Sequence, residues 1–207
     1  MKKKLFFILF LLMTTLCVFS QIKYEISGGT NIHRREGLED KQLGLQGGVS
    51  LYVNINENWY FRPNLSLVNL KSKYDNLAVW SYGNTQDKLE YTLNTKTNYL
   101  YLDIPLSIGY KILNKEFFNL NIEGGWFLSY GIGGKTKGTF DYPDKESVSF
   151  NDKTFRDDKK LNSGPTVSVS SIIKSHYLIR ASGEWEITNN SYYRKYQIYS
   201  LSIGYIF

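Results

Sequence analysis

The sequence predicts an all-β fold: an eight-stranded antiparallel up-and-down transmembrane β-barrel with short periplasmic turns and longer outer loops. Three observations predict it. Apolar and polar residues alternate with a period of two along most of the chain, which is the pattern of strands with one apolar face. The connections between these strands are alternately short and long, as in transmembrane barrels. The last segment, 196–207, places Tyr205 and Phe207 on one face, as expected for a strand that meets an apolar medium.

The first 20 residues form a separate unit. Lys2, Lys3 and Lys4 precede an apolar run, Leu5–Leu12, which is short compared with the ~20 residues that span a bilayer. This pattern predicts a secretory signal peptide at 1–20 and a barrel domain at 21–207; an N-terminal anchor helix is the alternative. Removing the three lysines lowers the formal charge from +6 to +3, which is too small to indicate nucleic-acid binding. The only cysteine is Cys17, so the barrel domain can form no disulfide.

Eight segments carry the alternation and are expected to be the strands: 22–32, 42–55, 59–70, 97–112, 117–132, 161–173, 177–187 and 196–207. The alternation slips at Val68 and Leu70, which predicts a bulge there. The polar stretches 71–96 and 133–160 are expected to be the long outer loops. An even number of strands places both termini on one side, which is the periplasmic side if the short turns lie there too.

The side chains decide which face points outward. A lipocalin-like soluble carrier has the same period of two with its apolar face inside, so that fold remains an alternative. Here the apolar face carries bulky Leu, Ile, Trp and Tyr residues, and the other face carries Gly, Ser and Asn. A narrow eight-stranded lumen suits the smaller polar set, and lipid suits the larger apolar set. Aromatic residues near strand ends predict two interfacial girdles, with Tyr99, Tyr130 and Trp185 in the outer one.

Charged residues on the polar face predict a network inside the barrel. An unpaired charge in an interior of low dielectric constant is costly, so we expect Arg62 and Arg180 to pair with Asp103, Glu123 and Glu184. This network would be structural and would plug the lumen; a proton or ion path is the alternative.

Surface contacts are expected on the long loops. Their aromatic residues include Trp80, Tyr82, Tyr142 and Phe155, which are candidates for contact with an unidentified extracellular or envelope protein. The same residues could instead pack the loops onto the rim, as we expect, or extend the strands as hairpins.

No catalytic, metal-binding or cofactor-binding pattern is present in the sequence. His33 is expected in the first outer loop and His176 in the last periplasmic turn, so the two histidines would lie at opposite ends of the barrel. Neither has a serine and an acid arranged around it as in an acyl hydrolase. A lipid-modifying enzyme is therefore a minor alternative.

Three stretches carry a resemblance to a known family: Tyr99–Leu106 (YLYLDIPL), the strand containing Gly124 and Gly125, and Leu201–Phe207 (LSIGYIF). They resemble the PorT-like small outer-membrane β-barrel proteins of Bacteroidota, with Asp103 where that family commonly has Glu. The resemblance implies an integral outer-membrane barrel that contacts membrane lipid and reaches the outer-membrane assembly machinery through its C-terminal strand. The expected function is a non-enzymatic structural or surface-interaction role; an envelope-assembly or secretion factor of the PorT type is the alternative.

Overall fold

The computed structural model describes residues 22–35, 42–82, 88–143, 145–154, 161–188 and 196–207. The described chain forms nine strands: β1 (Ile22–Arg35), β2 (Leu43–Asn54), β3 (Trp59–Tyr82), β4 (Lys88–Asn114), β5 (Phe118–Tyr142), β6 (Lys145–Lys153), β7 (Leu161–Ile173), β8 (Tyr177–Trp185) and β9 (Tyr196–Ile206). Within these residues, no helix has the length and apolarity needed to cross a membrane.

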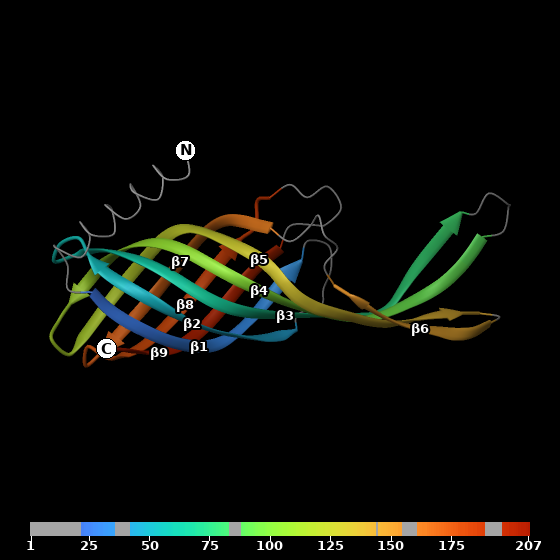
Figure 1. The fold of residues 1–207 in the computed structure, drawn as a ribbon, viewed down its shortest axis with the longest axis horizontal. Coiled ribbons are helices and arrows are strands. Elements are labelled where there is room, and N and C mark those ends of the chain that lie inside the picture. The colour runs from blue at the N-terminus through green and yellow to red at the C-terminus, as the bar shows by residue number, and fades with distance from the viewer. Residues whose placement is uncertain (1–21, 36–41, 83–87, 144, 155–160, 189–195) are drawn as a thin grey trace, which may run out of the picture.

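Eight of the strands close into a ring, which confirms the predicted barrel. The order β4-β3-β2-β1-β9-β8-β7-β5 is joined end to end by a β4–β5 pairing, and β6 pairs with β5 outside the ring. All neighbours are antiparallel. The first and last strands of the chain, β1 and β9, are neighbours in this ring, and their register runs from Glu25↔Ile206 to Arg35↔Tyr196. Figure 1 shows the barrel with short turns at one end, beside the C-terminus, and long hairpins at the other. We call these the short-turn end and the hairpin end.

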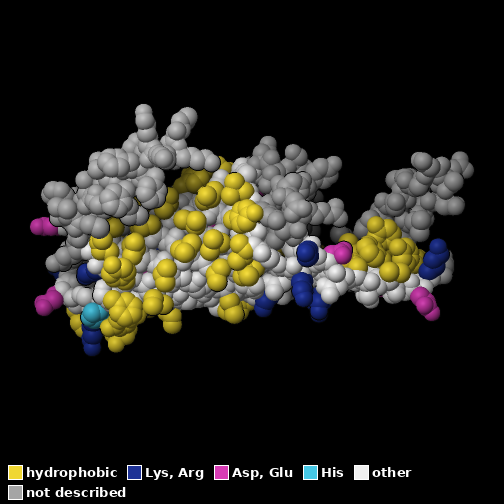
Figure 2. All heavy atoms as spheres, viewed as in Figure 1, with side chains coloured by type: hydrophobic (Ala, Val, Ile, Leu, Met, Phe, Trp, Pro, Cys, Tyr) yellow, Lys and Arg dark blue, Asp and Glu magenta, His cyan; other side chains and the backbone are white. Residues whose placement is uncertain are grey.

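The barrel wall turns its bulky apolar side chains outward, as the sequence predicts. Trp126 and Leu201 are 48% and 57% exposed, whereas Asp103 and Arg180 are 2% and 4% exposed. Figure 2 shows the resulting apolar cover over the visible side of the barrel. A lipocalin has the opposite orientation, so the alternative of a soluble carrier is wrong. The outward residues include Tyr24, Ile26, Leu45, Val49, Leu65, Leu67, Leu106, Ile108, Ile122, Leu128, Val167, Val169, Ile179 and Ile203.

Local hydrogen bonds explain the tight turns of the short-turn end. The Asn56 side-chain oxygen accepts hydrogen bonds from the backbone N–H groups of Asn58 (2.9 Å) and Trp59 (2.8 Å), as asparagine does in such turns. Lys174 and Ser175 have φ values of 50° and 61°, which gives the β7–β8 hairpin the twist of a primed turn. Exposed aromatic residues surround this end: Trp59, Tyr110, Phe117, Phe118, Tyr177, Tyr205 and Phe207.

The two polar stretches expected to be outer loops are strand extensions, so packing of these loops on the rim is wrong. β3 and β4 continue to pair as far as Tyr82↔Lys88, and β5 pairs with β6 beyond the ring. The β4–β5 pairing reaches Thr92↔Asp141 and joins the two hairpins. We call this projecting sheet, formed by residues 71–82, 88–98, 134–142 and 145–153, the arm; Figure 1 shows it extending from the barrel in green and orange.

The expected bulge at Val68 and Leu70 is also wrong. The β3–β4 register is unbroken from Ser66↔Asp103 to Tyr74↔Thr95, and both apolar side chains point into the lumen with 5% and 2% exposure. On β3 the outward apolar residues that face lipid end at Leu67. Beyond Leu67 the next apolar residues lie on the inward face, so the alternation of residue types slips although the strand is regular. Tyr99 likewise packs against this inner cluster instead of joining an outer girdle.

Candidate functional site in the barrel lumen

Two arginines and two glutamates form a layer of ion pairs across the lumen. Arg62 on β3 donates to Glu123 on β5, with Nε and Nη2 at 2.9 and 2.8 Å from Oε2. Arg180 on β8 donates to both carboxylate oxygens of Glu25 on β1, at 2.7 and 2.9 Å. Arg180 Nη2 also lies 3.6 Å from Glu123 Oε1. Strands from opposite sides of the ring are therefore linked by four side chains whose formal charges cancel.

Hydroxyl groups satisfy the remaining acceptors of this ionic layer. The Tyr52 hydroxyl donates to Glu25 (2.8 Å) and the Tyr60 hydroxyl to Glu123 (2.8 Å). Glu123 also accepts a hydrogen bond from Ser168 at 2.6 Å. Hydrogen bonds to charged groups are the stronger class, and such partners are what make a buried ion pair tolerable.

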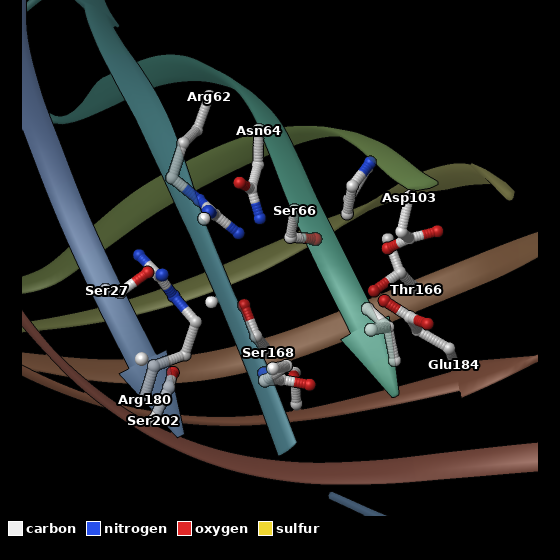
Figure 3. Close-up of a pocket in the computed structure, with 17 residues that line it drawn as sticks. Ser27, Arg62, Asn64, Ser66, Asp103, Thr166, Ser168, Arg180, Glu184 and Ser202 are labelled. Atoms are coloured by element: carbon white, nitrogen blue, oxygen red, sulfur yellow. The ribbon is translucent and has the colours of Figure 1, made fainter. Parts of the chain in front are cut away.

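Asp103 and Glu184 lie away from both arginines. Asp103 on β4 accepts a hydrogen bond from Ser129 on β5, and among the described residues no ion pair joins either carboxylate to Arg62 or Arg180. Both acids line a polar cavity of about 40 Å³ that also borders the two arginines. Figure 3 shows the arginines at one side of this cavity and Asp103, Thr166 and Glu184 at the other. A polar cavity of this size has room for about three water molecules.

An apolar cluster lies on each side of this polar region along the barrel axis. Val68, Leu70, Tyr101 and Ile198 form the cluster towards the hairpin end. Tyr52, Tyr60 and Ile206 form the cluster at the short-turn end, where Tyr52 and Tyr60 also reach the ionic layer. From one end to the other, the lumen therefore contains an apolar cluster, the ionic layer, the cavity with its two acids, and a second apolar cluster.

The residues that the sequence places in one network thus occupy two depths. Arg62, Arg180 and Glu123 meet, Asp103 and Glu184 lie nearer the hairpin end, and Glu25 is the partner that the predicted network lacks. Distance from the short turns could have indicated this: Arg62 and Arg180 each lie four residues past a turn residue, Asn58 and His176. The alternation along a strand shows whether a side chain points inward or outward, but it does not show how far along the barrel axis that side chain lies.

The two histidines lie far from this layer. His33 pairs in register with Ile198, while the Nδ1 atom of His176 lies 2.8 Å from the carbonyl oxygen of Ile206, at the other end of β9. His33 belongs to strand β1 instead of a loop. Across the described ranges, no group of three or more His, Cys, Asp or Glu residues could hold a metal ion.

Of the residues expected to make surface contacts, Tyr142 lies on the arm, with its ring 5.6 Å from that of Tyr91. The side chains of Trp80 and Tyr82, and the whole of Phe155, lie outside the described residues.

Comparison with known proteins places this barrel in a family. A family model described as an outer membrane protein β-barrel domain matches residues 19–192. No curated protein sequence matches the chain at a significant level.

Three solved structures are among those that are similar to this chain. One is Ail, the attachment invasion locus protein of Yersinia pestis, in complex with the heparin analogue sucrose octasulfate. Its sequence is 14% identical to this chain, the match covers 90% of this chain and 99% of Ail, and the TM-score is 0.43. Neisserial surface protein A is 11% identical, with 89% and 95% covered and a TM-score of 0.45. OprG from Pseudomonas aeruginosa is 12% identical, with 91% and 97% covered and a TM-score of 0.42. These similarities assign no ligand to this chain.

The family match spans most of the sequence, and the ring of eight strands carries its apolar side chains outward. The chain therefore belongs to the family of outer-membrane proteins with a β-barrel domain, and it is an integral protein of the bacterial outer membrane.

Proposed function

We propose that this protein is a non-enzymatic surface barrel whose lumen is plugged by side chains and whose arm makes contacts outside the cell. The observation that supports the plug is the ionic layer, held between two apolar clusters. Eight-stranded barrels have just enough interior room for side chains to fill. Because ions would have to separate Arg62 from Glu123 and Arg180 from Glu25, the barrel serves as a rigid platform instead of a pore.

Recordings across a planar bilayer test the plug. The wild-type protein, folded as judged by heat-modifiable mobility on a gel, is expected to give no stepwise conductance. A variant that removes one of the two ion pairs of the layer, Arg62→Ala with Glu123→Ala, is expected to give brief openings if it folds. A steady ion current through the wild-type protein would contradict the plug whatever the variant does.

The proposed orientation places the arm outside the cell and both termini and the short turns in the periplasm. Short periplasmic turns and longer extracellular segments are the rule in bacterial barrels. Because residues 21–207 contain no cysteine, single cysteines can report the side. A membrane-impermeant maleimide added to intact cells is expected to label Ser149→Cys on β6 and to spare Glu57→Cys in a short turn. The reverse pattern would contradict this orientation.

A partly exposed aromatic cluster on one face of the arm supports a role in protein contact. The ring of Tyr91 lies 5.5 Å from that of Phe140, and the rings of Phe140 and Phe150 are 4.9 Å apart. Val148, beside them on β6, is 53% exposed. Exposed aromatic anchors are typical of binding surfaces, and we propose an extracellular or envelope protein as the partner of this face.

We also propose that β9 carries the contact with the outer-membrane assembly machinery.

The PorT-type role remains the second candidate, because it rests on the resemblance at Tyr99–Leu106 and Leu201–Phe207. Deleting the gene and measuring protein secretion tests it: unchanged secretion eliminates this role. A lipid-modifying activity is tested separately by substituting His33 and His176, which is expected to leave the membrane lipid profile unchanged.

A further inference from the structure

Six lysines form two adjacent rows across the base of the arm. In the first row, Lys71 on β3 pairs with Asn98 on β4, which pairs with Lys135 on β5, which pairs with Lys153 on β6. In the second row, Lys73, Lys96 and Lys137 are direct cross-strand neighbours. We call Lys71, Lys73, Lys96, Lys135, Lys137 and Lys153 the lysine rows.

The lysine rows lie on the face that continues the lipid-facing wall. On β3, the outward residues Leu65 and Leu67 are followed on the same face by Asn69, Lys71 and Lys73, because the strand keeps its alternation. On β5, a register shift opposite Leu100 and Tyr101 places Lys135 and Lys137 on this same face. Figure 2 shows basic side chains gathered where the arm leaves the barrel, just past the apolar band.

The first lysine row lies just beyond the headgroup layer of a membrane, and the second row lies two residues farther out. The apolar band on β3 ends at Leu67, and Lys71 follows it by four residues. At about 3.3 Å per residue and a strand tilt of roughly 40°, Lys71 lies about 10 Å beyond Leu67 along the membrane normal. Headgroups occupy about 5–8 Å on each side of the hydrocarbon core, and lysine side chains can lean towards this layer.

Among the described side chains of the arm, the acids near the lysine rows supply little negative charge. Asp75 pairs with Lys73. Asp141 shares this face and keeps its negative charge, because hydrogen bonds from Ser147, Asn94 and Thr139 lower the pKa of its carboxyl group, but it lies four residues beyond Lys137 on β5, away from the lysine rows. Like charges directly opposite each other on neighbouring strands destabilise a sheet, so the rows gain most from an anion outside the chain.

We propose that the lysine rows bind the phosphate groups of a phosphorylated glycolipid, such as lipid A, in the outer leaflet of the membrane that the barrel spans. This inference rests on the proposed orientation, which places the hairpin end in that leaflet. The spacing of cross-strand neighbours, about 5 Å, lets two or three ammonium groups contact one phosphate. The bound lipid would hold the base of the arm at the membrane surface.

Binding of lipid A to the full-length protein in detergent tests the proposal. Native mass spectrometry would compare the wild type with the triple variant Lys96→Gln, Lys135→Gln, Lys137→Gln. Each lysine near a charged surface contributes roughly fivefold in affinity, so we expect the triple variant to bind lipid A more than tenfold more weakly at low salt. The matched control removes the same charge elsewhere: Lys23→Gln, Lys115→Gln, Lys145→Gln, which is expected to bind within twofold of wild type.

Two further measurements distinguish the phosphate groups of a lipid from free phosphate and from a soluble polyanion. The wild type is expected to bind dephosphorylated lipid A at least tenfold more weakly than lipid A, and neither inorganic phosphate nor a soluble sulfated polysaccharide should compete at equal phosphate or sulfate concentration. Equal binding by the triple variant, equal loss in the control, or preference for the soluble polyanion would overturn the proposal. The cysteine labelling of the arm is independent of lipid binding, so a failure of orientation is recognised separately.

Discussion

At the scale of single residues, Glu123 is the centre of the lumen. It accepts hydrogen bonds from Arg62, Tyr60 and Ser168, and it lies 3.6 Å from Arg180. Removing one partner of a buried pair leaves the other charge uncompensated, which is more costly than the pair is favourable.

Glu123→Gln is therefore expected to lower the free energy of unfolding by about 3 kcal/mol. Urea titration of the barrel in lipid vesicles, followed by tryptophan fluorescence, measures this change. The control is Glu57→Gln, an exposed turn residue, which is expected to change stability by less than about 0.5 kcal/mol. Equal stability of the two variants would show that the ionic layer does not contribute to stability.

Gly109 allows Tyr60 to reach Glu123. A Cβ atom at residue 109 would lie 2.1 Å from the Tyr60 ring, whereas one at Gly124, which faces outward, would have no atom within 4 Å. Gly109→Ala is expected to cost about 1–3 kcal/mol by overpacking, and Gly124→Ala is expected to be nearly neutral. The same urea titration compares them; equal midpoints would contradict the close packing of the Tyr60 ring.

At the scale of elements, the sequence predicts the strands inside the membrane better than those outside it. In the ring, alternation follows from lipid on one side and a polar lumen on the other, so β7 is located even with few apolar residues. On the arm both faces are exposed to water, and the alternation that identifies a strand is weakened by polar residues on each face. The sequence therefore predicts loops where the arm lies, although β3 and β4 remain paired as far as Tyr82 and Lys88.

The ring should not depend on the arm. Replacing residues 75–94 by Asn-Gly would join Tyr74 to Thr95, which are register partners, through a two-residue hairpin turn. This variant is expected to fold, to keep its heat-modifiable mobility and to unfold within about 1 kcal/mol of wild type, because the ring pairing is retained. A matched variant shortens β5 and β6 by replacing 141–147. Loss of folding in both would show that the arm supports the ring.

At the scale of the whole molecule, the orientation of the wall determines the environment of every side chain. Trp126 points outward and Tyr101 points inward, so both can report it. In a chain whose other tryptophans are changed to Phe, brominated acyl chains are expected to quench Trp126 strongly. A chain with Trp126→Phe and Tyr101→Trp is expected to show weak quenching. Similar quenching at both positions would contradict the orientation of the wall.

The sequence predicts the fold, the number of strands in the ring and the inward residues of the ring, because these follow from local alternation. It does not predict which inward residues meet, because Glu25 and Arg180 are 155 positions apart and their contact depends on the register of the closed ring. The division of the lumen into an ionic layer and a separate pair of acids is a consequence of that register.

The pairing of β1 with β9 has one more consequence. The first and last strands of the barrel are also the two edges that must find each other, so the cylinder stays open until its final segment has been synthesised and delivered. Before that moment, two rows of unpaired peptide groups would face hydrocarbon, where each is costly. A chain that lost β9 is therefore expected to leave one edge of β1 and one edge of β8 unpaired within the membrane.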